Sequence, residues 1–327
     1  MSLWERMFVF DDYGELLSLL HNSIIAGAVL GVVCGVISVF VTYRDLAFAV
    51  HGVSELSFAG AAGFLLLGAN VVTGSLIGAL LAALLIGLLG ERARDRNSVI
   101  GVLMPFGLGL GVLFLALYKG RAANKFGLLT GQIVAVDASR LAVLSAIAAV
   151  VLAALAVLWR PLTFASLDPE VATARGVPLR LLGPTFMLLL GATVAAAIQV
   201  VGALLVLSVV CTPGVAATMV TARRGLATAL SVLFATVSTV GGILLALGGT
   251  LPISPYITTL SFAIYLGCRV FAAVRGVRSR RGHRSDRHGP SSSLEDRLPL
   301  TGSVTGPRLH PSVVGFYAPP EAVSRTE

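Results

Sequence analysis

Charged residues are scarce in this chain of 327 residues: Asp, Glu, Lys and Arg together make up only 12% of it. Apolar residues make up 56%, and the mean hydropathy of +0.90 lies far above the values of soluble domains. This balance excludes an ordinary soluble fold. It predicts an integral membrane protein.

Cysteine and lysine are nearly absent as well. The three cysteines lie in apolar runs and are not spaced as a ligand pair, so neither a disulfide framework nor a thiolate metal site is indicated. The only two lysines, Lys119 and Lys125, do not end a glycine-rich phosphate loop, and there is no Gly-x-Ser-x-Gly motif. We therefore expect no enzyme and no cofactor bound by this chain, and any ATP-driven step requires a partner subunit.

Basic residues do not form the kind of surface that binds nucleic acid. The net charge is +8, but positions 275–327 hold nine basic and five acidic residues, so half of the excess lies in one tail. The first 20 residues contain Glu5, Asp11, Asp12 and Glu15 where a cleavable signal would carry basic residues. We predict neither a nucleic-acid partner nor a targeting peptide.

Long apolar runs, by contrast, recur along the chain. A membrane helix needs about 20 mainly apolar residues. Such runs predict an all-α, polytopic transmembrane helical bundle of about nine spans, with eight to ten compatible with the pattern. Glycines repeat within the runs at 27, 31 and 35 and at 107, 109 and 111, where they favour close helix packing. The nine runs are 23–43, 46–68, 70–90, 99–118, 141–159, 183–201, 203–220, 226–249 and 256–272.

The basic residues of the short loops predict the orientation. Under nine spans, most arginines fall on one side, together with the tail, and that side is expected to be cytoplasmic. The 119–140 loop disagrees, because its basic residues would lie outside. We expect three segments in a multi-pass protein of the plasma membrane: an extracytoplasmic segment at 1–22, a transmembrane domain at 23–274 and a disordered basic cytoplasmic tail at 275–327, which membrane lipid can attract.

One acidic residue stands out inside a predicted span. Glu55 lies about ten residues into the second span, where a charge is costly and marks a functional candidate. His51 precedes it by four residues, which places both side chains on one helical face. Nitrogen with carboxylate oxygen suits zinc and other divalent first-row metals. The same pair can also relay a proton or form a purely structural hydrogen bond, and the spacing does not decide between these three.

Other polar positions within the apolar runs are weaker candidates. Ser54 and Gln199 are considered as possible lining of the same path, although for Ser54 a helix-packing role is favoured. Pro213 removes a backbone donor, so an interrupted helix is expected near it.

The loop at 167–178 has the pattern of a short helix. Asp168 suits the N-cap, Pro169 the first turn and Gly176 the end. The plain interpretation is an interfacial connector. The functional one is a surface element gripped by a cytoplasmic partner.

At this loop the sequence begins to resemble a known family. The pattern of Asp168, Glu170, Ala172, Gly176 and Val177 is similar to the coupling segment of membrane permeases from ATP-binding-cassette importers for zinc and manganese. The stretches 129–136 and 199–206, the proline at 213 and the stretch 252–255 also resemble that family's motifs, in the same order.

The second span carries an exchanged version of the family's pattern, which usually reads Arg-x-x-x-x-x-Gly-Asp-Ala-Leu-Ser-His-Ala. Aligned through Arg44 and Ser54, the family's aspartate falls on His51 and its histidine on Glu55. The resemblance favours the metal interpretation. The exchange leaves the choice of metal open.

The resemblance implies a homodimer of permeases that moves a divalent ion, zinc or manganese. Each copy would bind a cytoplasmic ATPase subunit through the 167–178 helix, and an extracytoplasmic metal-binding protein would deliver the ion. The alternative is a secondary, proton-coupled transporter of metal or another small solute that uses the same pair and needs no nucleotide.

Overall fold

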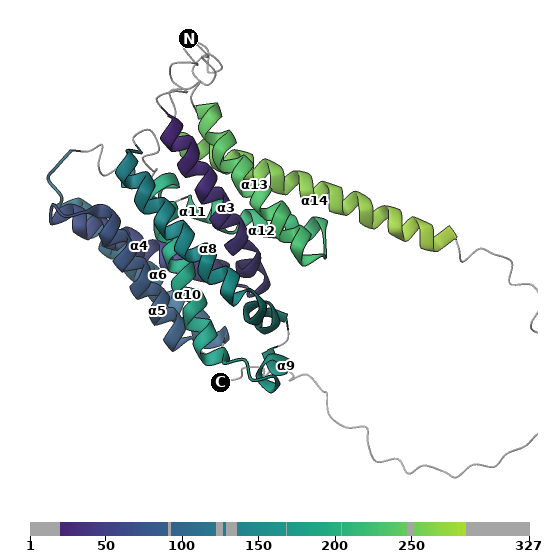
Figure 1. Ribbon diagram of the computed structural model, residues 1–327. Helices are drawn as coiled ribbons and strands as arrows, with labels where there is room; N and C mark the ends of the chain where they lie inside the picture. Colours follow the sequence, from purple (N-terminus) through teal and green to yellow (C-terminus); the bar gives the residue numbers. More distant parts are fainter. Residues whose placement is uncertain are drawn as a thin grey trace, which may run out of the picture. The chain divides into compact units, whose positions relative to one another are not determined.

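The computed structural model describes residues 20–90, 93–121, 127–128, 136–167, 169–203, 205–246 and 252–285, and within these ranges the regular structure is helical (Figure 1). Residues 1–19 of the predicted segment 1–22 and residues 286–327 of the predicted tail 275–327 fall outside them, whereas residues 275–285 continue the last helix. The helices are α3 (His21–Tyr43), α4 (Ala47–Leu66), α5 (Val71–Leu89), α6 (Ala93–Leu117), α8 (Ala138–Leu167), α9 (Pro169–Ala174), α10 (Leu179–Val201), α11 (Val206–Val210), α12 (Thr212–Val220), α13 (Arg224–Ala246) and α14 (Ile253–Ser285).

Eight of these helices are long and apolar enough to cross a membrane. They correspond to eight of the nine predicted runs, so the predicted helical bundle is confirmed. The ninth run, 203–220, is apolar but does not form one long helix. It folds as the two short helices α11 and α12.

The break between α11 and α12 follows from the local sequence. Gly202 ends α10 with φ 91°, a conformation that favours glycine, and the chain then turns into α11. Pro213 lies in the first turn of α12, where its missing N–H costs no hydrogen bond. On the opposite helix, the Ser38 hydroxyl donates to the carbonyl oxygen of Cys211 at 3.1 Å and accepts from the backbone N–H of Gly214 at 2.7 Å. The polar groups freed by the break are thereby partly satisfied inside the bundle.

Helix α3 packs against α13 through small residues. A side chain on Gly31 or Gly35 would collide with the α13 backbone at Thr236 or Val232. The close approach lets hydroxyls reach across: Ser231 donates to the carbonyl oxygen of Gly35 at 2.7 Å, and Thr239 donates to that of Gly27 at 2.8 Å. The predicted packing role of these glycines is confirmed.

Helix α4 is held between α5 and α6 in the same manner. On the α5 side the Ser57 and Ser75 hydroxyls lie 2.8 Å apart. On the α6 side, a Cβ on Gly107 would lie 3.0 Å from the carbonyl carbon of Glu55. Gly111 faces Phe58 as closely, whereas Gly109 has open space around it, so the predicted packing role fails at Gly109 because it lies on the other side of the helix.

Candidate functional site

The candidate site is built on α4, whose only ionisable side chains are His51 and Glu55. Four residues apart, they lie one helical turn from each other on the same face, as predicted. The Nδ1 atom of His51 lies 3.7 Å from Oε1 of Glu55. The imidazole is 34% exposed and the carboxylate only 7%. The pair therefore joins a buried acid to a ring that reaches the surface of this single copy.

The polar atoms of the pair are not saturated by each other. The separation of 3.7 Å exceeds hydrogen-bond range, and the His51 Nδ1 atom is buried without a hydrogen-bond partner among the described residues. A purely structural hydrogen bond inside the helix is therefore not formed in this conformation. Both groups retain the capacity to bind a cation or to exchange a proton.

The two serines next to the pair form hydrogen bonds with other groups. The Ser54 hydroxyl donates to the carbonyl oxygen of His51 at 2.7 Å, within the same helix, and Ser54 is fully buried. Ser57 bonds to Ser75 on α5. Both contacts favour packing, and Ser54 as lining of a path stays a prediction.

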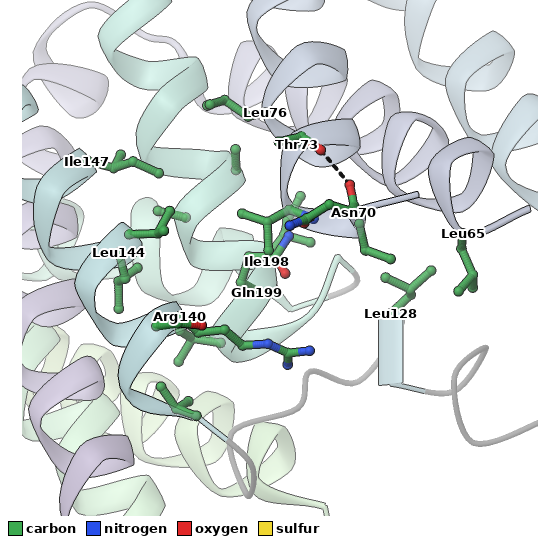
Figure 2. A pocket seen from close by; sticks show the side chains of 18 of the residues that line it. Leu65, Asn70, Thr73, Leu76, Leu128, Arg140, Leu144, Ile147, Ile198 and Gln199 are labelled. Atoms are coloured by element: carbon green, nitrogen blue, oxygen red, sulfur yellow. Dashed lines mark hydrogen bonds between the residues drawn. The ribbon is translucent and has the colours of Figure 1, made fainter. Parts of the chain in front are cut away.

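Gln199 lies apart from the pair. It is near the end of α10 and lines a pocket of about 590 Å³, which neither His51 nor Glu55 lines. Figure 2 shows Gln199, Asn70 and Arg140 extending toward the same space, from α10, the start of α5 and the start of α8. The Nε2 atom of Gln199 is buried and has no hydrogen-bond partner in the described part of the chain. The sequence pointed to Gln199 as a lone amide in an apolar run, but it gave no signal that Asn70 and Arg140 would join it.

The short helix predicted at 167–178 is present as α9. It begins at Pro169 and ends at Ala174, and Asp168 lies outside the described residues. The end is a Schellman motif: Gly176, with φ 79°, donates to the carbonyl oxygen of Thr173 at 2.9 Å, and Val177 donates to that of Ala172 at 3.0 Å. The predicted stop at Gly176 is confirmed.

Helix α9 and the turn after it combine buried and exposed residues. Ala172 is buried, whereas Glu170 and Gly176 are exposed and Val177 is half-buried. The Arg175 guanidinium lies 5.9 Å from the centre of the Phe164 ring of α8, which ties α9 to its neighbour. In Figure 1, α9 lies at the end of the bundle opposite to the start of α3. The short helix thus presents polar groups outward from one end of the spans.

A single copy does not form a complete metal site within the residues that the structure covers: they contain no group of three or more His, Cys, Asp or Glu side chains able to hold an ion. His51 and Glu55 supply one nitrogen and one carboxylate. Any tighter coordination requires ligands from water, the backbone or a second copy.

Comparison with known proteins identifies the family. The manganese transport system membrane protein MntC of Halalkalibacterium halodurans is 29% identical over 281 residues, which cover 85% of this chain and 96% of that protein. MntD of Bacillus subtilis, of the same description, is 28% identical over 277 residues, covering 78% and 92%. The solved structure of PsaBC from Streptococcus pneumoniae in complex with Fab has the same fold, with a TM-score of 0.70, 23% identity and coverage of 78% and 95%. The family described as the ABC 3 transport family matches residues 17–272, and the chain therefore belongs to the ABC 3 transport family.

Proposed function

We propose that this chain is the membrane permease of an ATP-driven importer for a divalent transition metal ion, which passes His51 and Glu55 on its way across the membrane. The observation that carries the proposal is the pair itself, one turn apart in a membrane helix. The acid is 7% exposed, and the buried imidazole nitrogen has no hydrogen-bond partner among the residues that the structure describes. A charge buried at this depth is costly unless it serves a partner or an ion.

The ligand chemistry supports manganese or zinc. Imidazole nitrogen and carboxylate oxygen both bind these ions, and neither group is soft enough to favour copper(I). Relatives described as manganese transport proteins support manganese before zinc. A site of two ligands per copy also suits transport, because an ion held by a full rigid set would not leave.

A homodimer completes the proposed path. Two copies that place α4 near a common axis would offer two nitrogens and two carboxylates to one ion. The 34% exposure of the His51 ring leaves it accessible to such a neighbour. The alternative, a secondary, proton-coupled transporter, would need no partner ATPase. Whether uptake depends on the ATPase therefore distinguishes the two proposals.

Coupling to ATP is assigned to α9. The helix and the turn after it form a surface projection at one end of the bundle, called the α9 projection below. It consists of the exposed Glu170, the buried Ala172 that anchors the helix, and the turn at Gly176 and Val177. We infer that Asp168 belongs to the same surface. A cytoplasmic ATPase subunit would bind the α9 projection, while an extracytoplasmic metal-binding protein would deliver the ion at the other end of the bundle.

The remaining assignments follow from this orientation. Helices α11 and α12 would together cross the membrane once, which makes nine crossings with the eight long helices. The protein would then lie in the plasma membrane with residues 1–22 outside, the permease domain at 23–274 and the tail at 275–327 in the cytoplasm. Gln199 would line the outer part of the path rather than the ion site.

Uptake of manganese and of zinc into proteoliposomes tests the proposal. The vesicles hold the chain with or without its ATPase subunit, and ATP is supplied on the ATPase side. We expect uptake only with ATPase and ATP, and its loss in the His51→Ala and Glu55→Ala variants with assembly intact. Thr258→Ala, whose hydroxyl donates to the carbonyl oxygen of Ser254 within α14, is the matched control. Uptake without the ATPase would support the secondary transporter instead, and uptake unchanged in both variants would remove the pair from the path.

A further inference from the structure

A second large pocket, of about 630 Å³, lies at the end of the bundle where α9 is attached. It shares no lining residue with the pocket of Gln199 and includes neither His51 nor Glu55. Its walls come from the connection between α3 and α4, from the end of α5, from the first part of α6 and from the residues on either side of α9. Its position therefore links α9 to the beginning of α4.

Three arginines line this pocket: Arg44, Arg96 and Arg180. Asp45 is the only carboxylate among its described lining residues. Burial lowers the pKa of Arg44, and the charge of Arg96 lowers it further. Arginine nevertheless stays protonated at neutral pH, so the two positive charges repel each other in a partly buried place. An anion in the pocket would relieve that repulsion.

The arginines outnumber the one described carboxylate of the pocket, and Asp45 offsets only part of their charge by its interaction with Arg96. The Arg44 guanidinium lies 5.1 Å from the centre of the Phe186 ring, which holds it by a cation–π contact. The Nε atom of Arg96 is buried and has no hydrogen-bond partner among the described residues. Arg180 is exposed at the first turn of α10. Five donors on each guanidinium suit the oxygens of a phosphate.

The backbone next to these arginines has an uncommon conformation. Asp45 has φ 51°, and among the described residues it is the only non-glycine with a positive φ. Aspartate tolerates this region better than most residues, and such strain is concentrated at functional sites. The conformation forms the tight connection that places Arg44 and Asp45 at the same pocket.

The other walls of the pocket are apolar and belong to membrane spans. Ile86 and Leu88 come from α5, and Met187 comes from α10. Leu88 is 57% exposed, so this side of the pocket opens on the outer surface of the single copy. The pocket thus combines a cationic end with an apolar side wall, which matches an amphiphile better than a soluble anion or an acidic peptide. Basic pockets between membrane helices are suited to anionic lipid headgroups.

We propose that this pocket binds an anionic phospholipid, with its phosphate between Arg44, Arg96 and Arg180 and its acyl chain along Leu88. The lipid would join the start of α4, which carries His51 and Glu55, to α10, which begins just after α9. It would thereby stiffen the connection between the helix proposed to couple to the ATPase and the helix proposed to line the path. Binding itself does not depend on which ion is carried.

Lipid binding to the full-length protein tests the proposal directly. The protein is reconstituted in nanodiscs of phosphatidylcholine with or without phosphatidylglycerol. The midpoint of thermal unfolding and the retained phosphatidylglycerol, by native mass spectrometry, are then compared for wild type, Arg96→Gln and Arg180→Gln. Arg140→Gln, which alters the arginine of the other pocket, is the matched control. We expect phosphatidylglycerol to raise the midpoint of wild type and of the control, and its affinity to fall about tenfold or more for each pocket arginine removed.

The outcomes separate lipid from the other sources of negative charge. An equal response to phosphatidylglycerol in all four proteins would overturn the proposal. So would stabilisation of wild type in phosphatidylcholine by inorganic phosphate alone to the same extent, because a free anion would then suffice. The side chains of Glu91, Asp95 and Asp168 lie outside the described residues. If one of these carboxylates neutralises the arginines, added phosphatidylglycerol will have no effect on wild type, which also overturns it. Arg180 is exposed, so Arg180→Gln keeps the test valid if Arg96→Gln fails to fold.

Discussion

The imidazole of His51 and the carboxylate of Glu55 face each other across one turn of α4, with Nδ1 and Oε1 3.7 Å apart. In the family motif to which the sequence was compared above, the acid stands at the first of these positions and the histidine at the second. Two groups one turn apart on the same helical face offer one nitrogen and one carboxylate in either order.

This relationship predicts that the order of the pair is unimportant while its composition is essential. The double variant His51→Asp with Glu55→His should retain a large part of metal uptake. Each single variant, which leaves two acids or two imidazoles, should lose at least about tenfold, as expected for residues that act as one unit. Uptake is measured in proteoliposomes with the ATPase present. Equal loss in the double and single variants would show that each position has its own separate requirement.

The close contact of α4 with α6 predicts a sharp difference between two nearby glycines. Gly107→Ala would push a methyl group against the backbone of Glu55, and overpacking of this kind costs about 1–3 kcal/mol. Gly109→Ala, two residues on and in open space, should be neutral or slightly stabilising. The midpoint of thermal unfolding in detergent measures both. Similar midpoints for the two variants would contradict the packing described for α4.

The Schellman motif at the end of α9 predicts a loss of coupling in Gly176→Val. A β-branched residue at the positive φ of 79° costs about 1–3 kcal/mol of backbone strain. The turn should therefore rearrange and change the structure of the α9 projection. We expect weaker retention of the ATPase subunit during co-purification. Gly225→Ala, a helical glycine of α13 with open space around it, is the control. If the Gly176→Val variant retained the ATPase subunit as well as the wild type does, this result would argue against α9 as the ATPase-binding element.

Ser38 is predicted to stabilise the break between α11 and α12. Ser38→Ala removes the bond to the carbonyl oxygen of Cys211, which also accepts from the N–H of Val215 at 3.4 Å, and the bond from the buried N–H of Gly214. The Gly214 N–H thereby loses its hydrogen-bond acceptor. The expected cost is about 1–3 kcal/mol. Thr228→Ala, which loses only an exposed bond to its own helix at Arg224, should change stability little. The comparison is made by thermal unfolding, and an equal effect of the two variants would count against this role.

Replacing Gln199 is predicted to leave thermal stability unchanged or to raise it, unlike the Ser38 variant. The Gln199 Nε2 atom is buried without a partner in the described part of the chain, a state that costs about 1–3 kcal/mol. Gln199→Leu should therefore leave the thermal midpoint unchanged or raise it, while metal uptake falls if the pocket belongs to the path. A lower midpoint would indicate that the Gln199 amide does form a stabilising hydrogen bond, with a group other than the described residues. Undiminished uptake would remove Gln199 from the path.

Much of the architecture was predictable because its signals are local. The apolar runs predicted the spans, and Pro169 and Gly176 predicted the ends of α9. The pairing of His51 with Glu55 follows from helical spacing alone. The division of 203–220 into two helices was only partly predictable, since Pro213 indicated an interruption but its length and apolarity suggested a span.

The arrangement around the site was not predictable, as the arginine pocket illustrates. Arg44, Arg96 and Arg180 are separated by more than fifty residues in turn, and each of them looks like an ordinary basic residue at the end of a span. Gly107 and Gly109 are equally plausible packing residues in the sequence, yet only Gly107 faces α4.

The sequence by itself determined that the chain crosses a membrane repeatedly, where the helices lie and that one acid and one histidine share a face within them. Only the tertiary structure decided which faces meet. The physical reason is that lipid is as apolar as a packed interior, so hydropathy does not distinguish a side that contacts lipid from one that contacts another helix. Val157 is 80% exposed and Leu155 is 1% exposed on the same helix, and both are equally suited to an apolar run. The rotation of each helix is therefore fixed by close packing and by hydrogen bonds between helices, which exist only once the bundle has formed.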